Sequence, residues 1–353
     1  MKTAEKIDIR ALSREDLRSF FTEKGEKAFR GNQVYEWLWK KGVHSFEEMT
    51  NLSLEHRSML SSRFTINHIA VDQMQRSQDG TIKNAVRLHD GLIVESVLIP
   101  TQSRTTACVS SQVGCSLDCR FCATARLKRM RNLNADEIFD QVVVIDRQSR
   151  LYFGRPLSNI VFMGMGEPLM NYPNVVKAIR KITAEEALGM SPRRITVSTS
   201  GVPKMIRRLA DENLRCNLAV SLHSAVDSTR TNIMPFNAKM PLNDLKEAIQ
   251  YWYQQTKSRV TYEYVVWEGI NDTPADIHAL LDFCKAAPCK VNLIEYNPID
   301  DGEFQQARED AIQGYVSRLE AAGITVTVRR SRGKDIDAAC GQLANKSTGE
   351  SVL

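Results

Sequence analysis

Three cysteines lie within eight residues in the stretch Cys115-Ser-Leu-Asp-Cys119-Arg-Phe-Cys122, which has the spacing C-x3-C-x2-C. The stretch follows a strand-like run near residue 108. We expect it to form a loop after the first strand of a barrel, at the carboxyl end where barrel active sites are built. Three thiolates so close in sequence can converge on one soft metal centre.

Strand-like and helical patterns alternate on the carboxyl side of this loop. We expect strands at 159–164, 194–199, 216–222, 260–266 and 290–296, and helices at 135–147, 202–213, 241–255 and 275–287. Strict alternation predicts a parallel sheet. Together with the strand near residue 108 it gives six units, which favours an α/β fold built as an incomplete (β/α)6 barrel over a doubly wound sheet. A last strand-like run, 324–330, follows a helix and precedes a Gly-rich tail.

Two smaller units precede the barrel, which we place at residues 105–353. Residues 1–65 are predicted to be helical, with apolar residues at helical spacing over 29–38 and 46–52. Such a unit could dock a polymer such as RNA or simply pack on the barrel. Residues 66–104 are predicted to form a β-hairpin connection, because Asp90-Gly91 separates two strand-like runs.

Composition excludes several classes of protein. The chain has 353 residues, 42% of them apolar, and a net charge of +5, which argues against disorder, collagen and coiled coil. No uncharged apolar run approaches the ~18 residues of a membrane-spanning helix. The start, MKTAEKIDIR, lacks the apolar stretch of a signal peptide. We therefore expect a cytoplasmic protein without a membrane partner, in which clustered cysteines serve a metal or catalysis rather than disulfides.

The triplet admits more than one metal. Zinc usually takes four ligands in a structural site, and the chain has no second C-x2-C pair. A four-cysteine iron–sulfur cluster also lacks an obvious fourth ligand. Three ligands fit better with a cubane [4Fe-4S] cluster whose fourth iron stays open for a small molecule. A zinc knuckle that borrows a distant Cys or His is the alternative.

With Phe121 inside it, the triplet resembles that of the radical S-adenosylmethionine enzymes. The resemblance implies a [4Fe-4S] cluster bound by the three cysteines, with S-adenosylmethionine chelated to the open iron and split to a 5′-deoxyadenosyl radical. Met163-Gly-Met-Gly166-Glu167-Pro168 is similar to the GGEP-type motif that binds the methionine amino group. A carboxylate facing an ammonium group is sound chemistry, and glycine lets backbone approach a ligand.

A closer resemblance, over essentially the whole chain, is to the RlmN/Cfr adenine methyltransferases of large-subunit ribosomal RNA. It is carried by Cys340 in RGKDIDAACGQL and by Cys108, seven residues before the triplet. It implies that Cys340 takes a methyl group from one S-adenosylmethionine and that the radical from a second one activates that methyl group for addition to adenine. Cys108 then attacks the sulfur of Cys340, which leaves a disulfide, and Glu95 accepts a proton.

The same resemblance assigns S-adenosylmethionine ligands at the ends of barrel strands. They are Ser198, Ser221, Leu222, His223 and Asn297, in addition to Gly166 and Glu167. The remaining cysteines, Cys216, Cys284 and Cys289, are interpreted as core residues.

The resemblance also implies the partners. They are 23S ribosomal RNA, transfer RNA as a further substrate, and an electron donor such as flavodoxin or ferredoxin, with the enzyme itself a monomer.

Methylation of carbon 2 of adenosine, as in the RlmN branch, is our primary hypothesis, and methylation of carbon 8, as in the Cfr branch, is the alternative. Two more distant alternatives are a radical enzyme with a small-molecule substrate and a non-enzymatic zinc or RNA-binding module. A basic cluster at 126–131 could hold phosphates beside the cysteine loop.

Overall fold

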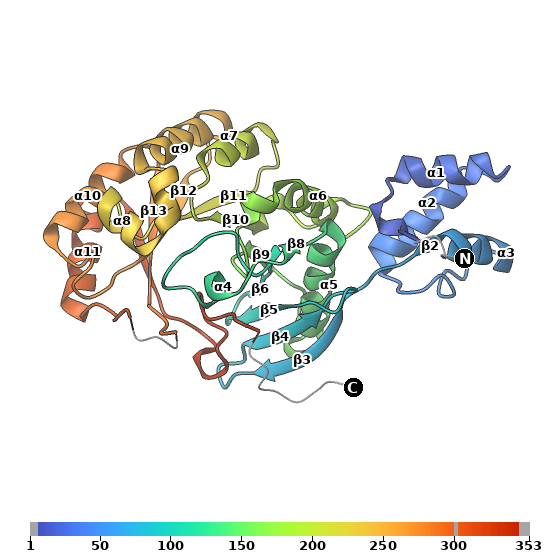
Figure 1. Ribbon diagram of the computed structural model, residues 1–353, viewed down its shortest axis with the longest axis horizontal. Coiled ribbons are helices and arrows are strands. Elements are labelled where there is room, and N and C mark those ends of the chain that lie inside the picture. Colours follow the sequence, from blue (N-terminus) through green and yellow to red (C-terminus); the bar gives the residue numbers. More distant parts are fainter. Residues whose placement is uncertain (1–5, 300–302, 346–353) are drawn as a thin grey trace.

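The computed structural model describes residues 6–299 and 303–345 (Figure 1). Its centre is a ten-stranded sheet in the order β14-β13-β12-β11-β10-β9-β6-β5-β4-β3. The strands from β6 to β14 in this order run parallel to their neighbours, which confirms the predicted partial barrel. They are β6 (Thr105–Cys108), β9 (Asn159–Phe162), β10 (Ile195–Thr199), β11 (Asn217–Ser221), β12 (Val260–Val265), β13 (Cys289–Ile294) and β14 (Thr325–Arg329).

Helices cover the outer face of this sheet (Figure 1). They are α5 (Ala135–Phe153), α6 (Tyr172–Thr183), α7 (Pro203–Asp211), α9 (Leu242–Thr256), α10 (Pro274–Cys284) and α11 (Glu309–Ala321). Helix α8 (Asp227–Ile233) instead follows β11 at the carboxyl ends of the strands. Helices α6 and α8 were not predicted from the sequence, whereas α11 is the helix expected before the strand-like run at 324–330.

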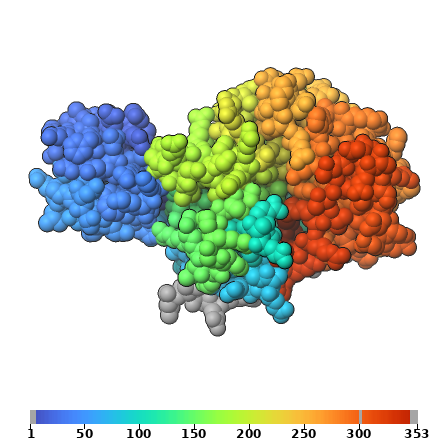
Figure 2. All heavy atoms as spheres, turned by 180° about the vertical axis from the view of Figure 1, so that it is seen from behind, coloured from blue at the N-terminus to red at the C-terminus, as the bar shows by residue number. Residues whose placement is uncertain are grey.

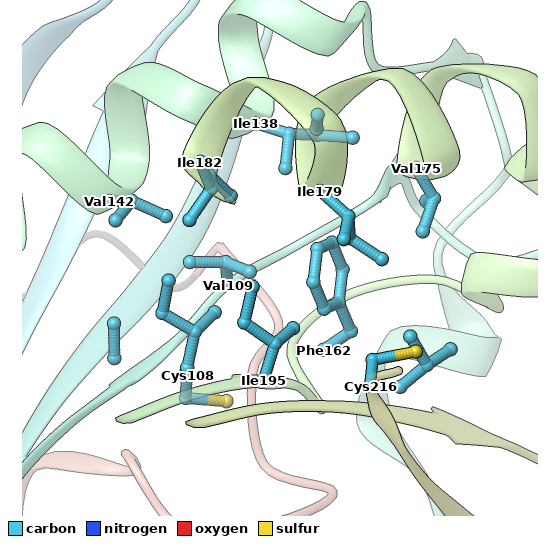
Figure 3. Close-up of a cluster of buried hydrophobic side chains, with 14 of the residues drawn as sticks. Cys108, Val109, Ile138, Val142, Phe162, Val175, Ile179, Ile182, Ile195 and Cys216 are labelled. Atoms are coloured by element: carbon cyan, nitrogen blue, oxygen red, sulfur yellow. The ribbon is translucent and has the colours of Figure 1, made fainter. Parts of the chain in front are cut away.

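Side chains from α5 and α6 pack on the strands beneath them. Ile138 and Val142 from α5 and Ile179 from α6 are fully buried. Figure 3 shows them facing the side chains of the first parallel strands, with Cys108 on the strand side of the same cluster. This packing fixes the carboxyl end of β6, and therefore the start of the cysteine loop, relative to the barrel. Among the described residues, no helix is long and apolar enough to cross a bilayer.

The segment before the barrel extends the same sheet. The predicted hairpin is present as β4 (Ile82–Arg87) and β5 (Ile93–Pro100), and its turn places Gly91 at a φ of +82°. A strand that was not predicted, β3 (Ala70–Arg76), pairs with β4, and β5 pairs antiparallel with β6. The hairpin therefore belongs to the barrel sheet and brings its own buried residues to the first barrel strand.

The N-terminal residues form a lobe beside the barrel (Figures 1 and 2). It contains α1 (Arg14–Glu23), α2 (Phe29–Glu36), a π-helical turn (Trp37–Lys41) and α3 (Leu54–Arg63), and it is closed by the parallel pair β1 (Ile7–Asp8) and β2 (Phe64–Thr65). The predicted helical pattern over 46–52 is wrong, because these residues form turns and the next helix begins after its cap, Ser53.

Two contacts dock this lobe on α5. The Trp39 and Phe139 rings meet edge to face with 5.2 Å between centroids. Buried Arg10 donates to both carboxylate oxygens of Asp140, at 2.6 and 2.7 Å. Because a bidentate guanidinium–carboxylate pair has a fixed geometry, it sets the angle at which the lobe meets the barrel.

Candidate active site

The cysteine triplet lies in the loop between β7 (Gln112–Val113) and α4 (Ala123–Arg126). Cys119 is buried, and Cys115 and Cys122 are half-buried. All three line one cavity that encloses about 1000 Å³, its mouth included. The loop thus carries its thiols at the carboxyl ends of the barrel strands, as predicted from its position in the sequence.

Backbone contacts hold this loop against the segment after β11. The Phe236 N–H donates to the Asp118 carboxylate at 3.1 Å, and the Arg120 N–H donates to the Ile233 carbonyl oxygen at 3.0 Å. Asp118 and Arg120 flank Cys119 directly in sequence. The position of this buried thiol is therefore set by contacts on both of its neighbours.

The charge balance of the loop fits a cationic cluster. Burial raises the pKa of Cys115 to about 12 and the pKa of Cys119 well above its ordinary value, and the adjacent Cys122 raises both further. Three thiolates can therefore share this site only with a positively charged centre. No three acidic, Cys or His groups among the described residues converge closely enough to hold one ion. Cys115, Cys119 and Cys122 would hold such a centre as the three thiolate ligands of an iron–sulfur cluster.

Most of the predicted S-adenosylmethionine ligands line the same cavity. Those that do so are Gly166, Glu167, Ser198, Ser221, His223 and Asn297. Leu222 does not, because its side chain is fully buried and its backbone is used within the barrel. Its N–H donates to the Glu263 carbonyl oxygen at 3.0 Å, and its carbonyl accepts from Arg230 at 3.1 Å.

The Gly-Glu-Pro turn is built by close backbone contact. Gly166 has a φ of +93°, and a Cβ at this position would lie 2.5 Å from the Gln112 side chain. The buried Glu167 carboxylate accepts the backbone N–H groups of Ser200 at 2.7 Å and Leu169 at 3.0 Å. Burial raises the pKa of Glu167, and the Ser200 donor partly offsets this rise. A cationic ligand group would restore its ionised form, as expected for a carboxylate that receives an ammonium group.

The protonation of His223 follows from its surroundings. Its Nδ1 accepts the Val265 N–H at 3.2 Å, so a neutral ring carries its proton on Nε2. Burial, together with the charge of Arg230, lowers the pKa of His223 to about 3. The ring also meets Phe121 of the cysteine triplet edge to face at 4.9 Å. His223 is therefore a neutral donor beside the cluster loop.

Asn297 joins the end of β13 to the C-terminal segment. Its Nδ2 donates to the carbonyl oxygen of Cys340 at 3.3 Å. Its Oδ1 is buried and has no hydrogen-bond partner within the described part of the chain. An orphaned acceptor of this kind costs free energy unless a ligand donates to it, so it fits an N–H or O–H group of a bound cofactor.

The two outlying cysteines approach the cavity from different sides. Cys340 is exposed within it, whereas Cys108, at the end of β6, is buried outside its lining. Burial and the nearby Cys340 raise the pKa of Cys108 to about 12. Burial also raises the pKa of Cys340, against the opposing charge of Arg329. Both are free thiols in the structure, so the disulfide between them stays a prediction.

Glu95 lies on β5, buried and outside the cavity lining. Its carboxylate faces the Lys83 ammonium group at 3.5 Å and accepts the backbone N–H groups of Ala344 at 2.8 Å and Asn345 at 3.2 Å. The structure therefore brings Glu95 to the segment that carries Cys340, but with its oxygens already engaged.

Two charged residues at this site, Glu263 and Arg230, were not predicted from the sequence. Glu263 lines the cavity and forms an ion pair with Arg329 at 3.2 Å. Fully buried Arg230 donates to carbonyl oxygens at the ends of β10 and β11, among them those of Ser200 and Ser221. A sequence signal existed for Glu263, because it is the one charged residue in the otherwise uncharged run VTYEYVV.

The basic cluster beside the loop is partly neutralised. Arg131 forms ion pairs with Glu137 at 2.7 Å and with Asp90 at 2.6 Å, and these contacts raise the pKa of Arg131. Lys128 and Arg129 are exposed next to it. Arg131 was one of the residues expected to hold phosphates, but its guanidinium group is used in ion pairs within the fold.

Comparison with known families covers both parts of the chain. Residues 7–66 match the ribosomal RNA large subunit methyltransferase N-terminal domain, and residues 109–284 match the radical SAM superfamily. The first match coincides with the helical lobe. The second begins directly after β6 and includes the cysteine loop and the Gly-Glu-Pro turn.

Whole-chain relatives agree with these matches. A protein of Flavobacterium johnsoniae named "Probable dual-specificity RNA methyltransferase RlmN" is 71% identical, over 97% of this chain and 98% of that protein. A Cytophaga hutchinsonii protein of the same name is 54% identical over 96% and 93%. The crystal structure of a radical SAM methyltransferase from Sphaerobacter thermophilus superimposes with a TM-score of 0.89 at 39% identity and covers 96% of this chain and 99% of that one. The chain therefore belongs to the RlmN family of radical S-adenosylmethionine methyltransferases.

Proposed function

We propose that the protein methylates carbon 2 of an adenosine in 23S ribosomal RNA, and of the transfer-RNA adenosine beside the anticodon, by way of an S-methyl group on Cys340. The observation that carries this proposal is the position of Cys340, exposed in the cavity that Cys115, Cys119 and Cys122 also line. The RlmN relatives are named for dual specificity, which supports both RNA substrates.

A protein thiol is needed because carbon 2 of adenine carries no acidic proton and does not attack an electrophilic methyl group. The cluster, with two molecules of S-adenosylmethionine per turnover, would supply the methyl group and a 5′-deoxyadenosyl radical. Cys115, Cys119 and Cys122 would hold the cluster, and Glu167 and Asn297 would bind S-adenosylmethionine. Cys340 would carry the methyl carbon to the adenine ring, and Glu95 would accept the proton that the ring loses.

Cys108 completes the proposed cycle. Its thiolate would attack the sulfur of Cys340, so that a disulfide forms and the bond between that sulfur and the bridging methylene carbon breaks. The electron pair of that bond would pass to the carbon and the adenine ring, and the carbon would take up a proton to become the methyl group. A donor such as flavodoxin or ferredoxin would supply electrons to the cluster, and a cellular thiol would reduce the disulfide. The nearby Cys340 contributes to the raised pKa of Cys108, so the two thiols lie close enough to interact, as this step requires.

RNA would reach the cavity past the N-terminal lobe and the exposed Lys128 and Arg129. The lobe presents an exposed Phe29 ring with Arg30 over it at 4.8 Å, and stacked aromatic–guanidinium surfaces suit unpaired bases. The target adenine would leave its stack to enter the cavity, as in other base-modifying enzymes. We propose a monomer, acting in the cytoplasm where both RNAs occur.

The test is mass spectrometry of nucleosides from large-subunit RNA and transfer RNA of cells with and without the active gene. We expect 2-methyladenosine in both RNAs, lost with Cys340→Ala and retained with Cys216→Ala, a buried cysteine remote from the cavity lining. A gain of 8-methyladenosine would assign the carbon 8 activity instead. Unmethylated adenosine from a protein shown to carry its cluster would overturn the proposal.

A further inference from the structure

A buried ion pair sits between the sheet and the C-terminal segment. Lys83 on β4 and Glu95 on β5 are diagonal neighbours on one face of this hairpin, because Glu95 is opposite Ala85 and Lys83 is opposite Val97. Their side chains are 4% and 2% exposed, and Nζ lies 3.5 Å from Oε1. A buried pair of charges is tolerated only where further hydrogen bonds satisfy its remaining atoms.

The C-terminal segment supplies those hydrogen bonds. Backbone N–H groups of Ala344 and Asn345 donate to Oε2 of Glu95 at 2.8 and 3.2 Å. The Asn345 side chain adds a third contact, because its Nδ2 donates to the carbonyl oxygen of Ile93 at 2.9 Å. The carboxylate is therefore shared between a lysine of the sheet and the backbone of a segment about 250 residues away in sequence.

The opposite side of this segment is bonded to the cluster loop. The carbonyl oxygen of Gly341 accepts the Ala123 N–H at 2.8 Å, and that of Leu343 accepts the Thr124 hydroxyl at 2.6 Å. Ala123 and Thr124 directly follow Cys122. Residues 341–345 thus lie between the cluster loop and Glu95, and Cys340 enters the cavity at their start.

We propose that Lys83 and Glu95 form a docking site for residues 341–345 and thereby hold Cys340 in the cavity that the cysteine triplet lines. The proposal rests on the proposed function for the roles of Cys340 as methyl carrier and of Glu95 as proton acceptor. Lys83 is then a positioning residue, and Glu95 positions the segment until the segment leaves it. Because Oε1 faces Lys83 and Oε2 accepts two N–H groups, Glu95 becomes available to an incoming adenine only when the segment leaves it. Release of Cys340 toward the substrate and exposure of the proton acceptor are therefore one event.

Hydrogen exchange of the full chain, purified anaerobically with its cluster and without RNA, tests this docking. In the double variant Lys83→Met/Glu95→Leu, we expect the amides of 341–345 to exchange about tenfold faster, because bonds to a charged acceptor are lost. Glu95→Gln retains a neutral acceptor and should have a smaller effect in the same direction. Peptides that cover β4 and β5 should keep their protection, since apolar replacement of a buried pair preserves packing.

The matched control is Lys285→Met, which removes a lysine–carboxylate pair with Asp282 on the exposed face of α10. It should leave the exchange of 341–345 unchanged. Labelling of Cys340 by iodoacetamide gives a second readout and should be faster in the double variant, where the thiol is no longer held in the cavity.

Unchanged exchange of 341–345 in the double variant would overturn the proposal. Equal loosening of β4, β5 and the segment would also overturn it, because the pair would then only stabilise the sheet. Neither measurement uses RNA or turnover. If the unaltered protein fails to methylate RNA but the double variant loosens this segment, only the proposed function is contradicted. If the unaltered protein methylates RNA and the segment stays protected in the double variant, only the docking site is contradicted.

Discussion

Asn297 and Cys340 meet where β13 ends: the side-chain amide of Asn297 donates to the carbonyl oxygen of Cys340 at 3.3 Å. One residue thereby joins the predicted S-adenosylmethionine pocket to the segment that carries the proposed methyl acceptor. The other end of the same amide, Oδ1, is buried and awaits a donor. Asn297 and Cys340 therefore share one wall of the cavity, and a ligand that donates to Oδ1 would lie beside the cysteine.

Removal of this amide should weaken cofactor binding. We expect Asn297→Ala to bind S-adenosylmethionine about tenfold less tightly, which corresponds to the loss of one or two hydrogen bonds in a buried site. Isothermal titration of the cluster-loaded protein measures this. Asn243→Ala, on the exposed face of α9, is the control. Equal affinity of both variants would show that Asn297 does not contact the cofactor.

Loss of Cys108 should stop the cycle after the carbon–carbon bond has formed. Because no thiolate can then release the product from Cys340, Cys108→Ala should accumulate protein joined covalently to RNA. Denaturing gel electrophoresis with labelled RNA would show a slowly migrating band that nuclease removes. Cys108→Ala/Cys340→Ala should give no such band. A free methylated product from Cys108→Ala would contradict the proposed role of Cys108.

Asp136 should make stability depend on pH. Burial raises the pKa of Asp136 from 3.8 to about 6, although Arg10 opposes this. The folded chain therefore binds this proton more tightly than the unfolded chain, and its contribution is complete below the unfolded pKa and lost as pH rises to about 6. Asp136→Asn should remove this loss and raise the free energy of unfolding at neutral pH by about 2–3 kcal/mol.

Urea unfolding at several pH values between about 4 and 7 checks this expectation. Asp244→Asn is a matched control, since Asp244 also stands in the first turn of a helix, α9, but is exposed. An identical pH slope in Asp136→Asn and the unaltered protein would show that Asp136 is not the responsible group.

Alanine substitutions at Gly166 and Gly91 distinguish the cost of backbone strain from the cost of a steric clash at the Gly-Glu-Pro turn. Gly166 and Gly91 both have positive φ angles, +93° and +82°, but only at Gly166 would a Cβ meet a neighbour, the Gln112 side chain at 2.5 Å. Gly91→Ala should cost about 1 kcal/mol of stability. Gly166→Ala should cost about 1–3 kcal/mol more and should also weaken S-adenosylmethionine binding. Equal destabilisation by the two changes would show that Gln112 moves aside.

Local patterns were enough for most of the barrel. The strands around Val197, Leu218 and Val291 were predicted because β-branched and apolar runs between helical stretches are a signal within a few residues. The cysteine spacing was equally local, since 115–122 forms one loop. The missed strand β3, in contrast, is a half-buried run with polar residues throughout, AVDQMQR, whose pairing with β4 depends on the neighbouring hairpin.

Site residues could be predicted only where they belong to a recognisable sequence motif. Glu167, His223 and Asn297 were assigned from resemblance, and the structure gathers them around one cavity. Arg230 and Lys83 had no motif. Their importance comes from burial of a charge, which depends on residues far away in sequence that pack around it.

The sequence by itself determined the family of this protein, and through that resemblance the spacing of three cysteines, the Gly-Glu-Pro turn and two outlying cysteines predict a cluster, a cofactor and a thiol route to a ring carbon. Only the tertiary structure decided how these parts engage. It placed Cys340 in the cavity and Cys108 behind it, and it joined Glu95 to the segment at 344–345 rather than to open space. The reason is physical, because a side chain's burial, charge partners and free lone pairs are set by contacts between distant segments, which no local pattern contains.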